Sequence, residues 1–310
     1  MRTIILAILS IAVALCTAIA QTQPSDGAAW SQEAANHYVV SPDQPYVTAG
    51  GIVLKLDVWQ NQVWQNKESK QALPTVMYIH GGGFEFGDRM GAVPQLFPYL
   101  NKGWNVVNVE YRLSGQALAP AAVEDVRCAL RWVYRNAANY NIDTDRIVVT
   151  GHSAGGHLAL MTGMLTSQDG FDNNCPASDT EKPLKVAAIV NWFGPSDFGV
   201  LLQGTPLLRA HAVKWIGQQP DSAALIKRVS PITYARPGLP PVITVHGDAD
   251  PAAPYESAVR FHAALDKAGD ANQLVTIPGG KHGFHAFEDA QTRDAYAKVF
   301  AFLSAQVPGL

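Results

Sequence analysis

A pentapeptide of the pattern Gly-x-Ser-x-Gly, at residues 151–155, constrains the fold of this chain more than any other feature. It follows the apolar, β-rich run 146–150 and precedes residues 156–165, which have helical character. A strand that enters a helix through this pattern turns sharply at its serine, and small flanking residues let strand and helix approach closely. The pattern therefore predicts that the hydroxyl of Ser153 is accessible to a substrate. Because the pattern also occurs in ordinary turns, the rest of the chain is needed to tell a nucleophilic serine from a serine in a common turn.

Apolar, β-rich runs alternate with helical segments along most of the chain. Strands are predicted at residues 52–59, 75–80, 105–110, 146–150, 186–192, 242–246 and 273–277, and helices at 121–139, 156–165, 255–268 and about 290–306. Several of the strands are apolar on both faces, as in a parallel sheet that helices cover on both sides. We therefore expect an α/β fold with a mostly parallel central sheet, helices on both faces, and functional groups at the carboxyl ends of the strands.

One segment, residues 196–240, departs from this alternation. It is rich in glycine and proline and is too long for a plain connection. We expect it to form a small cap over the strand ends of a single domain.

The first 20 residues have the pattern of a signal peptide. Arg2 precedes the apolar stretch 4–15, and residues 18–20 (Ala-Ile-Ala) fit a cleavage site. Residues 21–310 would then form the domain, in a secreted or periplasmic protein. Lipid attachment at Cys16 remains an alternative. No stretch of the mature chain is long and apolar enough to predict a membrane span.

Charge and cysteine content exclude some other classes. A net charge of −3 with 16% charged residues argues against a nucleic-acid partner. Cys128 and Cys175 have no partners in a metal-binding pattern, so no metal is expected. An exported protein permits a disulfide between them, but the sequence does not show whether they meet.

A serine nucleophile needs a base, and the base needs an orienting acid. In a sheet of this type the acid and then the histidine follow the serine along the chain. Strand 242–246 leads into a loop with two acidic residues, of which Asp250 is favoured because it lies further past the strand end. Asp248 fits a turn-forming residue that bonds its own loop.

The histidine that acts as the base for Ser153 is expected after strand 273–277. His282 lies in a glycine-flanked loop and is favoured over His285, which is placed as a surface residue. The remaining candidates, His37, His211 and His262, have no supporting pattern and are expected to be structural or solvated.

A glycine-rich segment, residues 81–83, directly follows strand 75–80. Glycines leave backbone N–H groups open to a ligand, and the segment is placed to bind an oxyanion beside the amide of Ala154. A phosphate loop is disfavoured because no Gly-Lys-Ser/Thr sequence follows.

Several motifs together resemble the α/β-hydrolase esterases related to hormone-sensitive lipase. They lie at residues 80–83, 111–112, 120–132, 151–157, 246–250 and 282–284. More narrowly, the chain is similar, over about residues 45–305, to the secreted bacterial branch of bifunctional carbohydrate esterases and feruloyl esterases. It departs from that branch at Phe84, where tryptophan is frequent, and in the loop of Cys175.

The resemblance implies an α/β-hydrolase fold and a site assembled from named residues. Its nucleophile, acid and base fall on Ser153, Asp250 and His282. Its oxyanion donors fall on the amides of Gly82, Gly83 and Ala154. No cofactor or metal is implied.

The expected function is a secreted serine carboxylesterase that acts on a small or polysaccharide-linked ester, with acetyl or feruloyl esters of plant cell-wall polysaccharide as the favoured substrates. Aromatic residues that are candidates for the substrate site are Phe84, Phe86, Trp192, Phe193, Trp215 and Phe284, about half of which are expected to be core. Two alternatives remain open: an amide hydrolase of the same fold (an arylformamidase or a peptidase), and a non-catalytic hydrolase-like binding protein. The oligomeric state is not predicted.

Overall fold

The computed structural model describes residues 31–32, 36–62, 72–176 and 183–310. The predicted signal peptide and Cys16 lie outside the described residues. Within the described part of the chain, no helix has the length and apolar character needed to cross a membrane.

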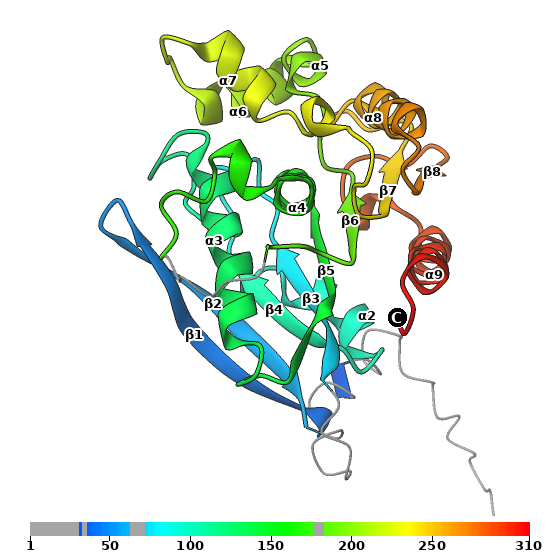
Figure 1. Ribbon diagram of the computed structural model, residues 1–310. Coiled ribbons are helices and arrows are strands. Elements are labelled where there is room, and N and C mark those ends of the chain that lie inside the picture. The colour runs from blue at the N-terminus through cyan, green and yellow to red at the C-terminus, as the bar shows by residue number, and fades with distance from the viewer. Residues whose placement is uncertain (1–30, 33–35, 63–71, 177–182) are drawn as a thin grey trace, which may run out of the picture.

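Eight described strands form one sheet in the order β1-β2-β4-β3-β5-β6-β7-β8 (Figure 1). Their bounds are β1 Tyr38–Ala49, β2 Ile52–Asn61, β3 Leu73–Ile79, β4 Asn105–Val109, β5 Ile142–His152, β6 Ala188–Trp192, β7 Val242–Gly247 and β8 Asn272–Ile277. The β1–β2 and β2–β4 pairs are antiparallel, and all pairs from β4 to β8 are parallel. The parallel strands therefore end at one edge, where the loops that follow them meet.

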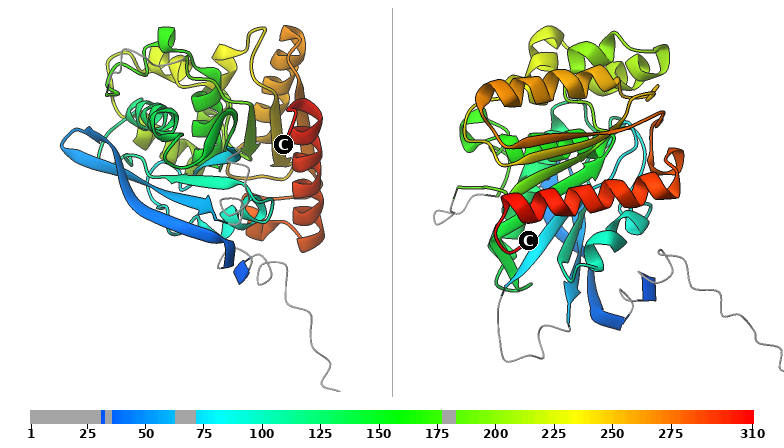
Figure 2. Two further views of the ribbon diagram at one scale, coloured as in Figure 1. Left: turned by 60° about the horizontal axis from the view of Figure 1, so that its bottom comes forward. Right: turned by 90° about the vertical axis from the view of Figure 1, so that its right-hand side faces the viewer.

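Side chains alternate between two apolar layers along the central strands. In β3, Met77 and Ile79 face one layer, and Val76 and Tyr78 face the other. The first layer is covered by α3 (Ala121–Asn136), α4 (Ala154–Met164) and α8 (Tyr255–Ala268), and the second by η2 (Val93–Leu96), α2 (Phe97–Leu100) and α9 (Asp289–Gln306). Figure 2 shows α9 along one side of the sheet. The expected α/β-hydrolase architecture is confirmed, with helices on both faces.

The segment for which a cap is predicted, residues 196–240, contains four short helices above the strand ends (Figure 1). These are α5 (Phe198–Leu202), α6 (Pro206–Ile216), α7 (Ser222–Arg228) and η4 (Pro231–Tyr234). Asp197 caps α5, because its carboxylate accepts from the amide of Gly199 at 2.9 Å. The imidazole of His157, on α4, meets the carbonyl of Val229 at 2.7 Å and joins the cap to the sheet layer.

Cys128 and Cys175 form a disulfide between α3 and the loop that follows η3 (Ser167–Asp169). Next to it, the buried guanidinium of Arg127 makes a two-point ion pair with Asp172, with both N···O distances at 2.7 Å. The loop is therefore fixed to α3 by a covalent bond and by a buried charge pair.

Several elements differ from the sequence prediction. The short helices η2, α2, η3 and η5 (Phe284–Ala286) were not predicted, and two larger differences concern β1 and α3. β1 was not expected, and it is an edge strand of which half the residues are exposed and whose register is interrupted by bulges. The helix predicted to reach residue 139 ends at Asn136, because residues 137–140 turn back toward β5. The other predicted strands and helices are present within a few residues of their expected bounds.

Candidate active site

Ser153 occupies the turn between β5 and α4 with a strained backbone, at φ 54° and ψ −122°. Its amide donates to the carbonyl of Trp192 at 2.9 Å. A Cβ atom on Gly151 or Gly155 would lie 2.4 Å or 2.1 Å from the carbonyl oxygen of Ile79, so neither position accepts a larger residue without movement. Close packing of β3, β5 and α4 therefore holds the serine in this conformation.

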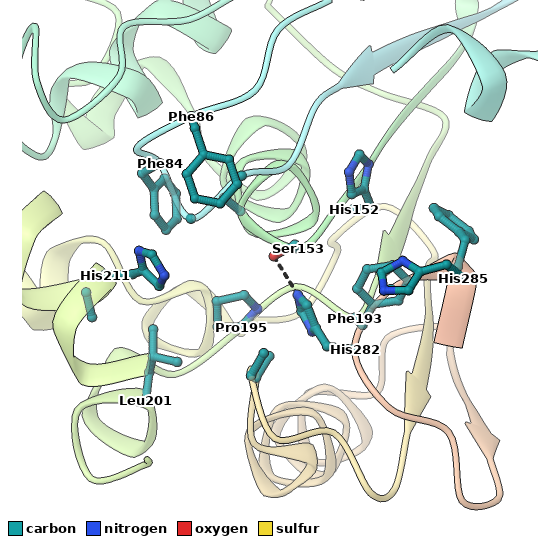
Figure 3. Close-up of a pocket in the computed structure, with 18 of the residues that line it drawn as sticks. Phe84, Phe86, His152, Ser153, Phe193, Pro195, Leu201, His211, His282 and His285 are labelled. Carbon is teal, nitrogen blue, oxygen red and sulfur yellow. Dashed lines mark hydrogen bonds between the residues drawn. The ribbon is translucent and has the colours of Figure 1, made fainter. Parts of the chain in front are cut away.

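Ser153, His282 and Asp250 lie in a hydrogen-bonded series, although the chain separates them widely. Figure 3 shows the hydrogen bond between Ser153 and His282. Nε2 of His282 is 2.8 Å from Oγ of Ser153, and Nδ1 is 2.7 Å from Oδ2 of Asp250. The other carboxylate oxygen accepts from the amides of Ala252 and Ala253, at 2.7 and 2.9 Å. The carboxylate is fully buried, whereas 23% of the His282 side chain is exposed.

A second histidine also contacts this carboxylate. Nε2 of the fully buried His246 lies 3.3 Å from Oδ2 of Asp250 and 2.9 Å from the carbonyl of Ala253. Burial alone would raise the pKa of Asp250, but hydrogen bonds from His246 and His282 outweigh it and hold the pKa well below its usual range. The acid therefore stays ionised and accepts the Nδ1–H of His282, which leaves Nε2 to accept the serine proton.

The two disfavoured alternatives lie outside this series. The carboxylate of Asp248 accepts from the amide of Gly279 at 2.7 Å, so it bonds the neighbouring loop rather than its own. His285 lies in η5 (Phe284–Ala286), is exposed, and contributes to the rim of the cavity.

The glycine-rich loop after β3 lines the same cavity as Ser153. Gly82 and Gly83 have φ values of 120° and 61°, and a Cβ on Gly82 would lie 1.9 Å from the carbonyl oxygen of Phe86. Among the residues that the structure describes, the N–H groups of Gly82, Gly83 and Ala154 donate to no protein acceptor. All three residues line the cavity at Ser153, as an oxyanion site requires.

His152 contributes to the site, and sequence reasoning missed it. Its Nδ1 is 2.8 Å from the hydroxyl of Tyr78, and its Nε2 accepts from the amide of Gly81 at 3.3 Å. Burial, with smaller contributions from His80 and His282, lowers the pKa of His152 to about 4. The neutral ring therefore holds Gly81 and orients the loop that carries the open amides. Its position directly before the serine is the one sequence signal that could have indicated this role.

The cavity above Ser153 has a volume of about 430 Å³. Its aromatic lining residues are Phe84, Phe86, Phe193 and Phe284, and its histidines are His152, His211, His282 and His285. Phe84, Phe86, Leu201 and His211 lie on one side of Ser153, and His152, Phe193 and His285 lie on the other (Figure 3). His211, expected to be structural or solvated, is placed by α6 in the cavity wall with 30% of its side chain exposed.

Two of the predicted substrate residues do not reach the cavity. Trp192 and Trp215 are both fully buried. Trp192 packs against Tyr296 of α9, with ring centroids 4.4 Å apart, and its indole nitrogen donates to the hydroxyl of Tyr99 on α2 at 3.2 Å. Trp215 stacks flat behind Phe84, with ring centroids 4.0 Å apart, and so supports the wall without facing the substrate. The assignment of these two tryptophans is thus corrected to core.

The described residues contain no group of three or more His, Cys, Asp or Glu side chains arranged to hold a metal ion. The remaining histidine of the sequence survey with a described contact, His262, is buried and bonds Asn272 at 2.6 Å, far along the chain from Ser153.

Several known proteins similar to this chain are esterases. Esterase LipQ of Mycobacterium tuberculosis is 28% identical over 270 residues, which cover 84% of this chain and 61% of LipQ. The chain spans about three fifths of the length of the first curated relatives it matches.

Two solved structures superpose over most of the chain. A truncated carbohydrate esterase from gut microbiota has 25% identity and a TM-score of 0.70, with 86% of this chain and 97% of the other covered. The propionate-bound esterase Est2 of the planctomycete Thermogutta terrifontis has 25% identity and a TM-score of 0.70, with 88% and 97% covered. A family model described as BD-FAE matches residues 62–265. Because this match spans more than half of the sequence, the chain belongs to the BD-FAE family.

Proposed function

We propose that the protein is a serine carboxylesterase in which Ser153 is the nucleophile, His282 the general base and Asp250 the orienting acid. The observation that carries the proposal is the series of two short hydrogen bonds from Asp250 through His282 to Ser153, beside three open amides. The esterase relatives and the propionate bound to Est2 of Thermogutta terrifontis support the same reaction class.

The geometry supports a two-step reaction through an acyl-enzyme. Oγ of Ser153 attacks the ester carbonyl as Nε2 of His282 takes its proton, and Asp250 stabilises the imidazolium. The oxyanion of the tetrahedral intermediate accepts from the amides of Gly82, Gly83 and Ala154. His282 then protonates the departing alcohol, and the carbonyl forms again on the serine.

The second step repeats the first with water as the nucleophile. His282 takes a proton from the water as its oxygen attacks the acyl-serine, and then returns a proton to Oγ of Ser153 as the acid leaves. The oxyanion passes through the same amides. No group is consumed, so the site is restored after each turnover.

For the substrate, we propose acetyl or feruloyl esters of plant cell-wall polysaccharide. A cavity of about 430 Å³ is within the range of small-molecule sites, roughly 300–1,000 Å³. Its aromatic lining fits both an aromatic acyl group and the apolar face of a sugar ring. The carbohydrate esterase among the similar structures supports this substrate class.

The test is a substrate panel with a matched pair of variants. We expect wild type to hydrolyse p-nitrophenyl acetate, methyl ferulate and acetylated xylan, and Ser153→Ala to lose about 10⁴–10⁶-fold in kcat. Ser304→Ala removes an exposed hydroxyl on α9 and serves as the control with unchanged rate.

Three outcomes would contradict parts of this proposal. Near wild-type hydrolysis by Ser153→Ala would exclude the nucleophile. Faster hydrolysis of p-nitroacetanilide than of p-nitrophenyl acetate would favour an amide hydrolase. A preference for long acyl chains over acetyl and feruloyl groups would exclude the carbohydrate-ester substrates.

We further propose that the protein is exported to the periplasm or the medium. The bond between Cys128 and Cys175 supports this location, since disulfides persist in oxidising compartments. Expression of the full sequence in a Gram-negative host is expected to yield a processed protein that begins near residue 21. An intact N-terminus on cytoplasmic protein with reduced cysteines would contradict export.

A further inference from the structure

The cap contributes one polar group to the cavity wall. Of the cap side chains that the structure describes, Leu201, His211 and Ala212 line the cavity, and only His211 has polar atoms. Figure 3 shows its ring projecting toward the cavity beside Phe84 and Phe86, across Ser153 from His152. A polar atom on an otherwise apolar wall is the kind of group that orients a ligand.

Two contacts fix the orientation of this ring. Nδ1 of His211 lies 3.1 Å from Oε2 of Glu85, and the ring meets Phe86 edge-on with centroids 6.1 Å apart. Lys214, one turn further along α6, pairs with the other oxygen of Glu85. A hydrogen bond from Lys214, with a smaller contribution from His211, lowers the pKa of Glu85, so this group is a carboxylate.

The carboxylate determines which nitrogen of His211 carries the proton. Glu85 can only accept, so Nδ1–H of His211 donates to it, and in this tautomer the lone pair of the imidazole is at Nε2. No group in the described residues is hydrogen-bonded to this Nε2. The cavity wall therefore presents a fixed acceptor that is suited to a hydroxyl donor.

His211 also lies against the proposed oxyanion loop. A Cβ on Gly83 would be 3.1 Å from Nδ1 and 3.2 Å from Cγ of His211. An ester carbonyl held by the amide of Gly83 is thus close to the ring. A hydroxyl on a carbon next to the ester group is the substrate group that we expect on this side of the cavity.

We propose that His211 is a specificity-determining residue that accepts a hydrogen bond from a hydroxyl adjacent to the scissile ester. The inference rests on the proposed esterase function and makes it narrower. It assigns the site to partially acylated polyols or sugars, or to esters of 2-hydroxy acids, in preference to esters without a neighbouring hydroxyl. Both substrate classes offer a hydroxyl donor next to the ester. In the first class the hydroxyl is on the alcohol part of the ester, and in the second it is on the acyl part.

The experiment compares two substrate pairs of equal size. 2-Hydroxyethyl acetate against propyl acetate tests a hydroxyl on the alcohol, and ethyl glycolate against ethyl propionate tests one on the acyl group. The readout is the ratio of kcat/KM within each pair, corrected for the ratio of hydroxide-catalysed rates. One net hydrogen bond predicts a corrected ratio of about five in wild type, for the pair whose hydroxyl bonds Nε2 of His211.

Three variants locate the preference. His211→Phe keeps a ring but loses the acceptor, so its corrected ratio should fall to about one. His211→Gln keeps an acceptor oxygen and should retain part of the preference. Lys214→Met removes the ion pair between α6 and Glu85 but leaves the acceptor nitrogen of His211 in place, so it should keep the wild-type ratio.

The outcomes separate this inference from the proposed function. A wild type that hydrolyses all four esters with ratios near one overturns the role of His211 and leaves the esterase standing. A preference that persists in His211→Phe, or is lost equally in Lys214→Met, also overturns it. A wild type that hydrolyses none of the esters overturns the esterase function and this inference together.

Discussion

The two walls of the cavity are built in different ways. On the sheet side, Ser153 and Asp250 each follow a parallel strand, and the Asp250 carboxylate is fully buried among four donors. On the cap side, short helices supply the wall, and His211, Glu85 and Lys214 tie it to the loop with 30%, 29% and 55% of their side chains exposed.

This difference suggests that the reaction and the choice of substrate depend on different walls of the cavity. Groups with buried, multiply bonded partners keep their geometry, as a transition state requires. Partly exposed ion pairs contribute little to stability, so the cap wall is held more weakly and can change with less effect on the fold. The sheet side should therefore determine whether an ester is hydrolysed, and the cap side should determine which ester.

The largest effect is expected from Asp250→Asn on the sheet side. Loss of the charge removes the acceptor that sets the tautomer of His282, so kcat should fall about 10⁴-fold. Asp248→Asn, in the same loop but bonded to Gly279, should change kcat less than tenfold. Steady-state kinetics on p-nitrophenyl acetate measures both, and equal losses would remove the distinction between the two carboxylates.

The next effect is expected from Gly82→Ala in the oxyanion loop. The new methyl group would collide with the carbonyl of Phe86 and turn the loop amides away from Ser153. A loss of about 10²–10³-fold in kcat follows from one lost oxyanion donor. Circular dichroism should show an unchanged fold, and a wild-type kcat would place the oxyanion site elsewhere.

A smaller effect is expected at His157, which joins α4 to the cap through the carbonyl of Val229. Burial, partly offset by the hydrogen bond to Val229, lowers the pKa of His157 to about 4 from its ordinary value of 6.5. The unfolded chain therefore takes up this proton at higher pH than the folded one. The stability due to the neutral ring is complete above pH 6.5 and is lost as the pH falls toward 4.

The full loss at His157 is about 3 kcal/mol in the free energy of unfolding. Urea unfolding at pH 7.5 and 4.5 measures it, and His157→Gln should reduce the difference between the two pH values. An identical pH dependence in His157→Gln would mean that this histidine is not the acid-sensitive group. The pKa of His152 is also lowered to about 4, so in His157→Gln this second histidine should still cause a similar loss of unfolding free energy at low pH.

The smallest effect is expected from Lys214→Met on the cap side. The ammonium group is more than half exposed, so its loss should lower the free energy of unfolding by less than about 1 kcal/mol. Thermal denaturation tests this value. A loss above about 2 kcal/mol would show that the cap is held as firmly as the sheet side.

The sequence predicts the sheet side well because its signals are local. Strands such as β3 and β7 are buried on both faces and therefore read as continuous apolar runs. The turn residues that follow them, Gly82, Asp250 and His282 among them, mark the strand ends. β1 escapes prediction because an exposed edge strand interrupted by bulges has no regular apolar alternation.

The cap side depends on contacts that no local pattern specifies. His211 reaches the cavity only because α6 folds back over Gly83, which is more than a hundred residues earlier in the chain. Trp215, four residues later on the same helix, points behind Phe84. Trp192 is in step with Val190 on β6, and this alternation indicates that it belongs to the α9 layer.

The central claim is that His282 and Asp250 activate Ser153, and covalent labelling with paraoxon tests it most directly. Est2 of Thermogutta terrifontis has been solved phosphorylated by this compound. We predict one phosphoryl group per chain, located on Ser153 by peptide mass spectrometry, with loss of hydrolysis in proportion to labelling. Labelling should be absent in Ser153→Ala and much slower in Asp250→Asn. A label on another residue, or one that persists in Ser153→Ala, would contradict the claim.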